Sequence, residues 1–352
     1  MKKSKDPHSV SWQRVSLIVL CVILALVLFV MVFATAYISH LIGMVTIQDT
    51  THDTLSPDQI ATATEAPDDT IFTGPSVGHE DVTISTLPSI PPEELKAEGI
   101  INIMLIGEDR RPGEGRQRSD SMILCSFNTN NNTITMISFL RDTYVSIPGF
   151  HPEKLNAAYC FGGPSTLDQP LAANFGVHVD ANVMVQFDGF EKIIDMLGGV
   201  DIELTAKEAK YLNTSDLFAY HGWNLSAGKQ HLDGAQTLAY SRIRKIDMDA
   251  MRAKRQRTVL TALINAYKNK SLTEMVTLSS KILETGFIQT DMTAKELTNY
   301  VISLFPMLST AAINSQQIPA ANTYTEMSVG SLTYCKVPDL EANRAILKKI
   351  LK

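Results

Sequence analysis

The chain has 352 residues, of which 45% are hydrophobic and 19% are charged, and its formal net charge is −6. This composition suffices for one large folded domain or two small ones, and it excludes a wholly disordered chain, a collagen and a disulfide-dense scaffold. The 4 cysteines include no C-x-x-C pair that would indicate metal or redox chemistry, and they leave Cys160 and Cys335 either as free thiols or as one disulfide.

The N-terminal segment predicts a membrane anchor. Residues 15–38 contain no charged side chain and are dense in Leu, Val, Ile and Phe. A helix of this segment is long enough to span a bilayer. Basic residues predominate in residues 1–14, so the positive-inside rule places this short tail in the cytoplasm and the rest of the chain outside the cell membrane. A cleaved signal peptide is the alternative, but its apolar core would be shorter than this one.

Residues 39–98 predict an extended linker. They are rich in Thr, Asp, Pro and Ser, and Lys96 is the one base among many acidic residues. A segment of this composition buries little apolar surface, so we expect an acidic stalk that holds a domain of residues 99–352 away from the membrane. Because the tail and the stalk carry most of the net charge, the domain itself is nearly neutral.

From residue 100 onward, short apolar runs alternate with helical patterns, which predicts an α/β fold in which helices flank both faces of a mixed sheet. The predicted strands are residues 101–106, 121–127, 133–139, 182–187, 200–204 and 331–336. The predicted helices are residues 154–161, 166–174, 190–197 and 339–351, with three or more further helices before residue 308.

The most basic stretch is SRIRKIDMDAMRAKRQR, residues 241–257. Its first part alternates, which predicts a strand that carries Arg242 and Arg244 side by side on one face. Arginines held on rigid elements suit bidentate capture of phosphate, whereas a solvated charge run is the alternative. The nearly neutral domain around this stretch indicates an anion site rather than general binding to nucleic acid, and we expect no nucleic-acid partner.

The second part of the stretch predicts the start of a helix. Asp249 is the expected N-cap, and Arg252 and Gln256 share one face at helical spacing. The apolar continuation VLTALINAY indicates that this helix packs into a core.

Polar residues also gather at the ends of the predicted strands, where ligand sites of α/β sheets lie. Asp109 and Asp120 flank a Gly-rich loop and could share a hard cation such as Mg²⁺, with Arg118 and Arg141 holding the same phosphates. The alternative is a set of ion pairs on loops, Arg118 with Asp120 and Arg141 with Asp142. The chain lacks the signatures of P-loop, Rossmann, zincin and serine-hydrolase sites.

Five ordered blocks between residues 101 and 257 resemble the motifs of the LytR–CpsA–Psr (LCP) family, which are membrane-anchored enzymes of the bacterial cell envelope. The blocks are RSDSMILCSFN, ISFLRDTYVSIPG, KLNAAYCFGG, VQFDGFEKIIDMLGGVDIEL and LDGAQTLAYSRIRK with DMDAMRAKRQR. The resemblance implies a phosphotransferase that moves a glycopolymer, such as a teichoic acid or a capsular polysaccharide, from undecaprenyl pyrophosphate onto a muramic acid hydroxyl of peptidoglycan.

The resemblance also implies site residues. The family's carboxylates for Mg²⁺, or Mn²⁺ in its place, fall on Asp109 and Asp120. Its pyrophosphate-binding arginines fall on Arg118, Arg141, Arg242 and Arg244. Its later Asp, Arg and Gln fall on Asp249, Arg252 and Gln256. The chain departs from the family at Arg257, where the family often has Gln, and after Arg244, which leaves the role of Asp247 open.

Three matters stay open at this level. The general base for the acceptor hydroxyl is either a carboxylate near the metal or Asp249. The lipid tail is expected between the sheet and helices, in apolar runs that could equally be ordinary core. A non-catalytic binder of polyprenyl phosphates, an envelope sensor and a lipid pyrophosphatase are the alternatives to the transferase.

Overall fold

The computed structural model describes residues 93–108, 115–215, 218, 221–247, 249–268 and 270–352, with residues 40, 43, 46–47 and 76–77. The predicted tail and membrane helix, residues 1–38, lie outside the described residues, as does the loop of residues 109–114. Within the described part of the chain, no helix is long and apolar enough to cross a membrane.

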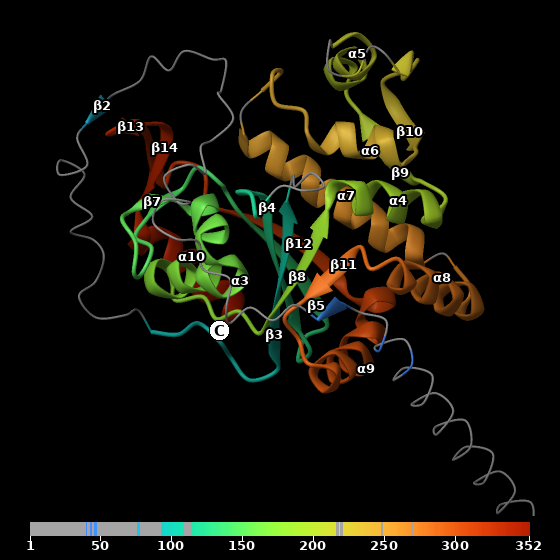
Figure 1. The fold of residues 1–352 in the computed structure, drawn as a ribbon, viewed down its shortest axis with the longest axis horizontal. Helices are drawn as coiled ribbons and strands as arrows, with labels where there is room; N and C mark the ends of the chain where they lie inside the picture. The colour runs from blue at the N-terminus through green and yellow to red at the C-terminus, as the bar shows by residue number, and fades with distance from the viewer. Residues whose placement is uncertain are drawn as a thin grey trace, which may run out of the picture.

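A mixed sheet with the strand order β1-β11-β8-β3-β4-β5-β12 forms the centre of the molecule (Figure 1). Neighbours β3, β4 and β5 are antiparallel, whereas β8 runs parallel to β3 and β12 runs parallel to β5. The strands are β1 (Thr46–Ile47), β3 (Ile100–Glu108), β4 (Ser119–Asn128), β5 (Thr133–Phe139), β8 (Ala181–Gln186), β11 (Ile288–Thr290) and β12 (Ala312–Ile318). The prediction of a mixed sheet is confirmed.

Helices cover both faces of this sheet because the strands are apolar on both sides (Figure 1). On one face, α3 (Leu155–Phe175) and α10 (Leu340–Leu351) bury Met104, Leu124 and Ile137. On the other face, α7 (Asp249–Lys268) and α9 (Ala294–Thr310) pack on Ile123, Cys125, Ile134 and Met136. The helix α3 corresponds to both helices predicted for residues 154–161 and 166–174, which are separated by a kink at Gly162 and Gly163. The φ of 76° at Gly163 disfavours other residues.

A smaller lobe lies beside the sheet, at the upper right of Figure 1, around a core of its own. It contains α4 (Phe187–Leu197), β9 (Val200–Leu204), α5 (Ala206–Thr214), β10 (Gly228–Leu232) and α6 (Gly234–Ser241). The predicted strand through Arg242 and Arg244 is wrong, because α6 extends to Ser241 and Arg242 is its C-cap. A capping box of Asp233 and Gln236 begins this helix and overrides the short alternating pattern.

The described parts of the predicted stalk contact the domain. β1 pairs with β11, and β2 (Ser76–Val77) pairs with β13 (Tyr324–Val329), which forms a hairpin with β14 (Leu332–Pro338). Leu95 is buried in the main core. The described segments of the predicted stalk therefore pair with or pack on the domain, while the bounds of the stalk stay a prediction.

Three cysteines of the described chain, Cys125, Cys160 and Cys335, are free and buried. The disulfide between Cys160 and Cys335 that the sequence left open does not form. Burial raises the pKa of Cys125 and of Cys335 to about 12, so these two thiols are not poised for redox or nucleophilic work.

Candidate active site

The register of the β4–β5 hairpin places an acid opposite a base. Ile123 pairs with Ser138, and continuing this antiparallel register beyond the strand ends sets Arg141 opposite Asp120. Nη1 of Arg141 lies 3.2 Å from Oδ1 of Asp120. The two motifs, 21 residues apart, therefore meet because the turn between the strands fixes their pairing.

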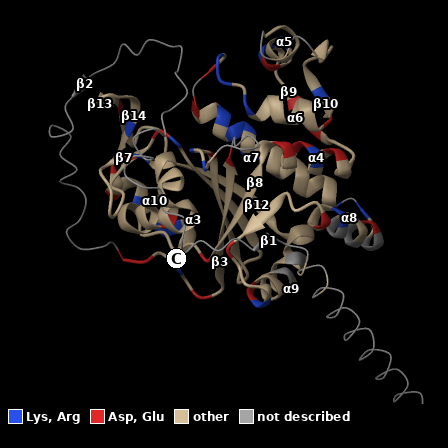
Figure 2. Ribbon diagram, in the orientation of Figure 1, with Lys and Arg blue, Asp and Glu red and all other residues tan. Residues whose placement is uncertain are grey.

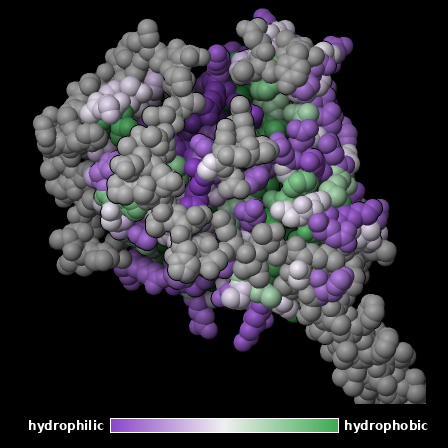
Figure 3. Space-filling model, in the orientation of Figure 1, coloured by the Kyte–Doolittle hydropathy of each residue, from purple (hydrophilic) through white to green (hydrophobic). Residues whose placement is uncertain are grey.

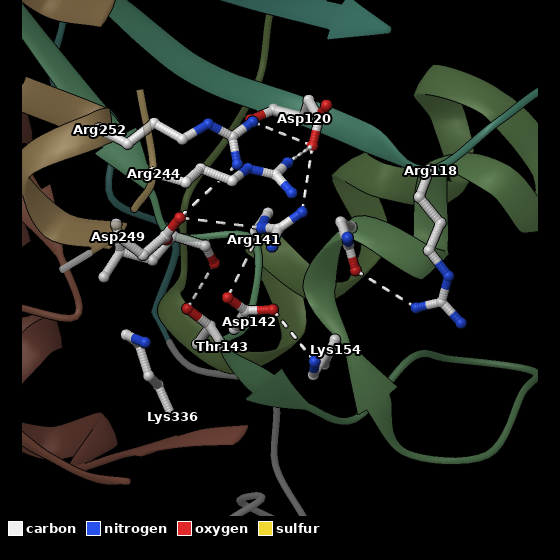
Figure 4. Close-up of polar contacts among 12 residues, drawn as sticks. Arg118, Asp120, Arg141, Asp142, Thr143, Lys154, Arg244, Asp249, Arg252 and Lys336 are labelled. Carbon is white, nitrogen blue, oxygen red and sulfur yellow. Dashed lines mark hydrogen bonds and ion pairs between the residues drawn. The ribbon is translucent and has the colours of Figure 1, made fainter. Parts of the chain in front are cut away.

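Two further guanidiniums converge on the same carboxylate oxygen (Figure 4). Nη2 of Arg244, from the loop after α6, and Nη2 of Arg252, from the first part of α7, each lie 2.9 Å from Oδ1 of Asp120. Nη2 of Arg252 also donates to the backbone oxygen of Asp120 at 2.8 Å. A strand, a hairpin end, a loop and a helix thus all meet at Asp120.

The pKa of Asp120 and that of Arg244 are both lowered within this cluster. Burial alone would raise the pKa of Asp120, but Arg252, Arg244 and Arg141 outweigh it and hold that pKa well below its usual range. Desolvation and the guanidiniums of Arg252 and Arg141 lower the pKa of Arg244 to about 10, although Asp120 and Asp249 oppose this. The carboxylate is therefore ionised at neutral pH, and the cluster can accept more negative charge.

Asp249 and Gln256 complete the wall of the site. Oδ1 of Asp249 lies 3.6 Å from Nη1 of Arg252 and 3.8 Å from Nε of Arg141. Asp249 is in the first turn of α7 rather than before it, so its expected N-cap position differs. Nε2 of Gln256 donates to the backbone oxygen of Asp120 at 3.5 Å.

These side chains line a depression that is open to solvent. Its lining residues are Asp120, Ser121, Phe139, Leu140, Arg141, Asp249, Arg252, Ala253 and Gln256. Basic side chains gather at the N-terminal part of α7 and the loop before it (Figure 2), and Figure 3 shows a hydrophilic hollow at this upper edge of the molecule.

The other two predicted arginines, Arg118 and Arg242, do not contact Oδ1 of Asp120. Nη1 of Arg118 lies 3.4 Å from Oδ1 of Asn156 and 3.7 Å from Oε1 of Glu153, so the expected ion pair of Arg118 has a different partner. The guanidinium of Arg242 lies over the ring of Phe187, 4.8 Å from its centroid. Because Arg242 is the C-cap of α6, it does not share one face of a strand with Arg244.

Sequence reasoning missed two lysines near Asp142, Lys154 and Lys336, which lie beneath the arginines in Figure 4. Nζ of Lys154 forms an ion pair with Oδ1 of Asp142 at 3.1 Å. Nε of Arg141 lies 3.6 Å from Oδ2 of Asp142, which is the ion pair that the sequence suggested. Lys336, on β14, donates its backbone N–H to the backbone carbonyl oxygen of Asp142 at 2.8 Å. Lys154 opens the block KLNAAYCFGG and could have been singled out, whereas nothing in the sequence relates Lys336 to this site.

A buried arginine ties the loop of Arg244 to α7. Arg255 donates from Nε to Oε1 of Glu208 at 2.7 Å and from Nη1 to the backbone oxygen of Ile243 at 3.0 Å, and it forms an ion pair with Asp247. This contact gives Asp247, whose role the sequence left open, a structural partner. Arg255 therefore holds in place the loop that presents Arg244.

The residues of the described chain fit a small, hard cation only in part. Asp109 lies outside the described residues, but Glu108, the residue before it, pairs with Ser119, the residue before Asp120. Among the described residues, no group of three or more His, Cys, Asp or Glu side chains could hold a metal ion. An ionised Asp120 suits Mg²⁺, which typically takes one or two carboxylates and completes its shell with water and phosphate oxygens.

Known proteins share this sequence and this fold. A polyisoprenyl-teichoic acid–peptidoglycan teichoic acid transferase, TagU of Oceanobacillus iheyensis, is 36% identical over 219 residues, which cover 58% of this chain and 64% of that protein. The regulatory protein MsrR of Staphylococcus aureus is 29% identical over 240 residues, covering 67% of this chain and 70% of that protein. The crystal structure of B. subtilis TagT matches 72% of this chain and 91% of its own, with a TM-score of 0.57 and 26% identity.

The family model agrees with these pairwise similarities. The model of the LytR_cpsA_psr family matches residues 63–349, which include every residue of the arginine cluster. This match covers most of the chain, and it includes β2, the hairpin β13–β14 and most of α10 as well as the central sheet. The chain therefore belongs to the LytR_cpsA_psr family.

Proposed function

We propose that this protein is a membrane-anchored phosphotransferase that moves a glycopolymer from polyprenyl pyrophosphate onto peptidoglycan through a phosphodiester. The polymer class is a teichoic acid or another wall or capsular polysaccharide. The name of the relative TagU supports this proposal, because it describes a polyisoprenyl-linked teichoic acid and a peptidoglycan acceptor.

The observation that carries the proposal is the convergence of Arg141, Arg244 and Arg252 on one oxygen of Asp120 in an open depression. Planar guanidiniums bind the oxygens of phosphate in a bidentate manner. Three guanidiniums around one point suit the several negative charges of a pyrophosphate better than an anion of one charge. The lowered pKa of Arg244 supports this assignment, because burial and the neighbouring guanidiniums both disfavour its charge, and an anionic ligand would offset both effects.

The proposed reaction is a single displacement at phosphorus. The acceptor hydroxyl oxygen bonds to the phosphorus that bears the glycan, and the bond from this phosphorus to the bridging oxygen breaks. The electron pair leaves with the bridging oxygen as polyprenyl monophosphate, and the hydroxyl proton passes to Asp249. Catalysis of this kind rests on positioning and charge neutralisation, which the fixed arginines supply.

A divalent cation is part of this proposal. Asp120, together with Asp109, is proposed to hold Mg²⁺, or Mn²⁺ in its place, against the phosphate oxygens. When bound, the cation supplies positive charge that stabilises the developing charge on the departing phosphate. The ionised state of Asp120 supports this assignment.

We propose that residues 15–38 cross the cell membrane and that the domain lies outside it. The charge pattern of the first 38 residues supports this orientation. The pairing of β1 with β11 also brings the chain segment that follows this apolar stretch to the edge of the sheet. A lipid-linked donor then reaches the site from the same membrane that anchors the enzyme.

The proposal is tested with the full-length chain in detergent or lipid nanodiscs, a synthetic polyprenyl-pyrophosphate glycan, Mg²⁺ and peptidoglycan oligomers. We expect glycan transfer to the oligomer, a loss of about a hundredfold or more for Arg244→Leu, and a smaller loss for Arg242→Leu, whose side chain lies over Phe187. Turnover without the acceptor would indicate a lipid pyrophosphatase. Tight binding of the donor with no turnover under any metal would indicate a binder or sensor.

Replacing Asp249 tests the proposed general base. Asp249→Asn preserves the shape of the side chain and removes its ability to take a proton, so we expect transfer to fall by about 10²–10⁴-fold while donor binding persists. The measurement compares single-turnover transfer with donor binding over a range of pH. Full glycan-transfer activity in Asp249→Asn would show that another carboxylate is the general base.

A further inference from the structure

Arg257 is a buried guanidinium that lacks hydrogen-bond partners. Only 8% of the residue is exposed, and its Nε and Nη1 atoms make no hydrogen bond to the described residues. Burial lowers its pKa, and no carboxylate of the described residues counters this effect. A buried cation without a partner costs several kcal/mol, so such a group is rare unless a ligand completes it.

The position of Arg257 on α7 relates it to the site. Ala253, four residues earlier, lines the depression at Asp120, and Leu260, three residues later, packs against Ile123, Cys125 and Met136 of the sheet. Residues three and four apart share one face of a helix. Arg257 therefore lies between the arginine cluster and an apolar surface beneath α7.

A second unpartnered group among the described residues lies on the sheet face toward α7. Ser138 is 2% exposed, and its Oγ has no hydrogen-bond partner in the described chain. Alternate residues of β5 share a face, so Ser138 is on the side of Met136, which packs toward α7. Ser138 pairs across the sheet with Ile123, which is also in that apolar cluster. A helix and a strand that face each other thus both bury unused polar groups.

The neighbouring Arg255 shows that α7 can satisfy a buried guanidinium when structure requires it. Arg255 is 2% exposed, and it contacts Glu208, Asp247 and the backbone of Ile243. Two residues further along the same helix, Arg257 has no such carboxylate among the described residues. This difference separates a guanidinium that stabilises the fold from one that is available to a ligand.

We propose that Arg257 and Ser138 form a subsite for a phosphate monoester, which in the transfer reaction is that of the departing polyprenyl phosphate. This inference rests on the proposed function for the identity of the lipid. The subsite lies between the depression of the arginine cluster and the apolar cluster of Ile123, Cys125, Met136 and Leu260. A phosphate joined to an apolar chain has the same order of charged and apolar parts.

The subsite would compensate the negative charge that the transfer reaction leaves on the departing lipid phosphate. When the bond from the glycan-bearing phosphorus to the bridging oxygen breaks, that oxygen keeps the electron pair, and the departing lipid phosphate becomes a monoester of charge close to −2. Arg257 adds a cation on the lipid side of the site, where this charge develops.

The first arm of the test measures the thermal stability of the full chain without ligand. A guanidinium held for a ligand destabilises the free protein, so Arg257→Met is expected to raise Tm by about 2–4 °C. The matched control, Arg255→Met, is expected to lower Tm because it leaves Glu208 without its partner. A fall in Tm for Arg257→Met like that of the control would assign Arg257 to the fold and overturn the proposal.

The second arm measures binding to three probes: a polyprenyl monophosphate, the matching uncharged polyprenol and inorganic phosphate. We expect Arg257→Met to weaken polyprenyl monophosphate about tenfold, Arg257→Lys to restore part of this loss, and polyprenol to bind all variants equally. The same dependence on Arg257 for inorganic phosphate would support the subsite but assign it to free phosphate. Equal binding of polyprenyl monophosphate to the parent and to Arg257→Met would overturn it.

Neither arm requires transfer, so the two proposals fail separately. A parent protein that binds polyprenyl monophosphate through Arg257 but never transfers glycan would contradict the proposed function and leave this subsite standing. A parent protein that transfers glycan, with product inhibition by polyprenyl monophosphate unchanged in Arg257→Met, would contradict the subsite alone.

Discussion

Asp120→Asn is expected to lower glycan transfer by about a thousandfold and to destabilise the protein by about 3 kcal/mol. The amide keeps the shape of the carboxylate but leaves Arg141, Arg244 and Arg252 without the negative charge at which they converge. It also removes the proposed metal ligand. Transfer assays and urea unfolding measure the two effects. Asp188→Asn, on α4 and outside this cluster, is the matched control and should retain the stability of the parent.

The stability difference between parent and Asp120→Asn should depend on pH in a defined direction. The pKa of Asp120 is lowered in the folded protein, so its stabilising effect is fully present above the pKa of about 4 that an unfolded Asp has. The effect is lost as the pH falls from there toward the folded pKa. We therefore expect a constant difference at pH 6–8 that shrinks below about pH 4, and a difference that shrinks instead between pH 6 and 8 would contradict the assignment.

Arg255→Met should have the largest effect on stability, about 3–5 kcal/mol. The side chain of Arg255 is 2% exposed, and its removal leaves the buried Glu208 without its cation. It also frees the loop of Ile243 and Asp247, so Arg244 loses its fixed position and transfer falls as well. Urea unfolding and the transfer assay measure both consequences.

The matched control for Arg255→Met is Lys254→Met, one residue earlier on the exposed side of α7. A substitution at an exposed position away from such contacts is expected to change stability by no more than about 0.5 kcal/mol. Similar losses in both variants would show that the contacts of Arg255 do not hold the lobe and the helix together.

Local patterns predicted much of the central sheet. The apolar runs of residues 101–106, 121–127 and 133–139 became β3, β4 and β5, because each run is bounded by turn residues and pairs with its neighbour in sequence. The helix α10 was equally clear from its period. Asp120 and Arg141 follow from the same hairpin, so this part of the site was within reach of sequence reasoning.

The segment from Gly234 to Arg244 shows where local patterns fail. Alternation over a few residues predicted a strand through Arg242 and Arg244. A capping box and burial in the core of the smaller lobe instead make residues 234–241 a helix. The side chain of Arg242 consequently lies over Phe187, and only Arg244 reaches Asp120. The short pairings of β1 and β2 were missed for a related reason, since edge pairing depends on a partner strand far along the chain.

The amino-acid sequence alone determined which residue types are available: arginines near residues 118, 141 and 242–257, with acids at strand ends. The tertiary structure decided which of them meet. Arg244 and Arg252 reach Asp120 across more than 120 positions of the chain, and Lys336 arrives beside Asp142 from a C-terminal hairpin. Such long-range contacts depend on the packing of α7 and of β14 around the sheet, and periodicity, which describes only neighbours in sequence, carries no information about them.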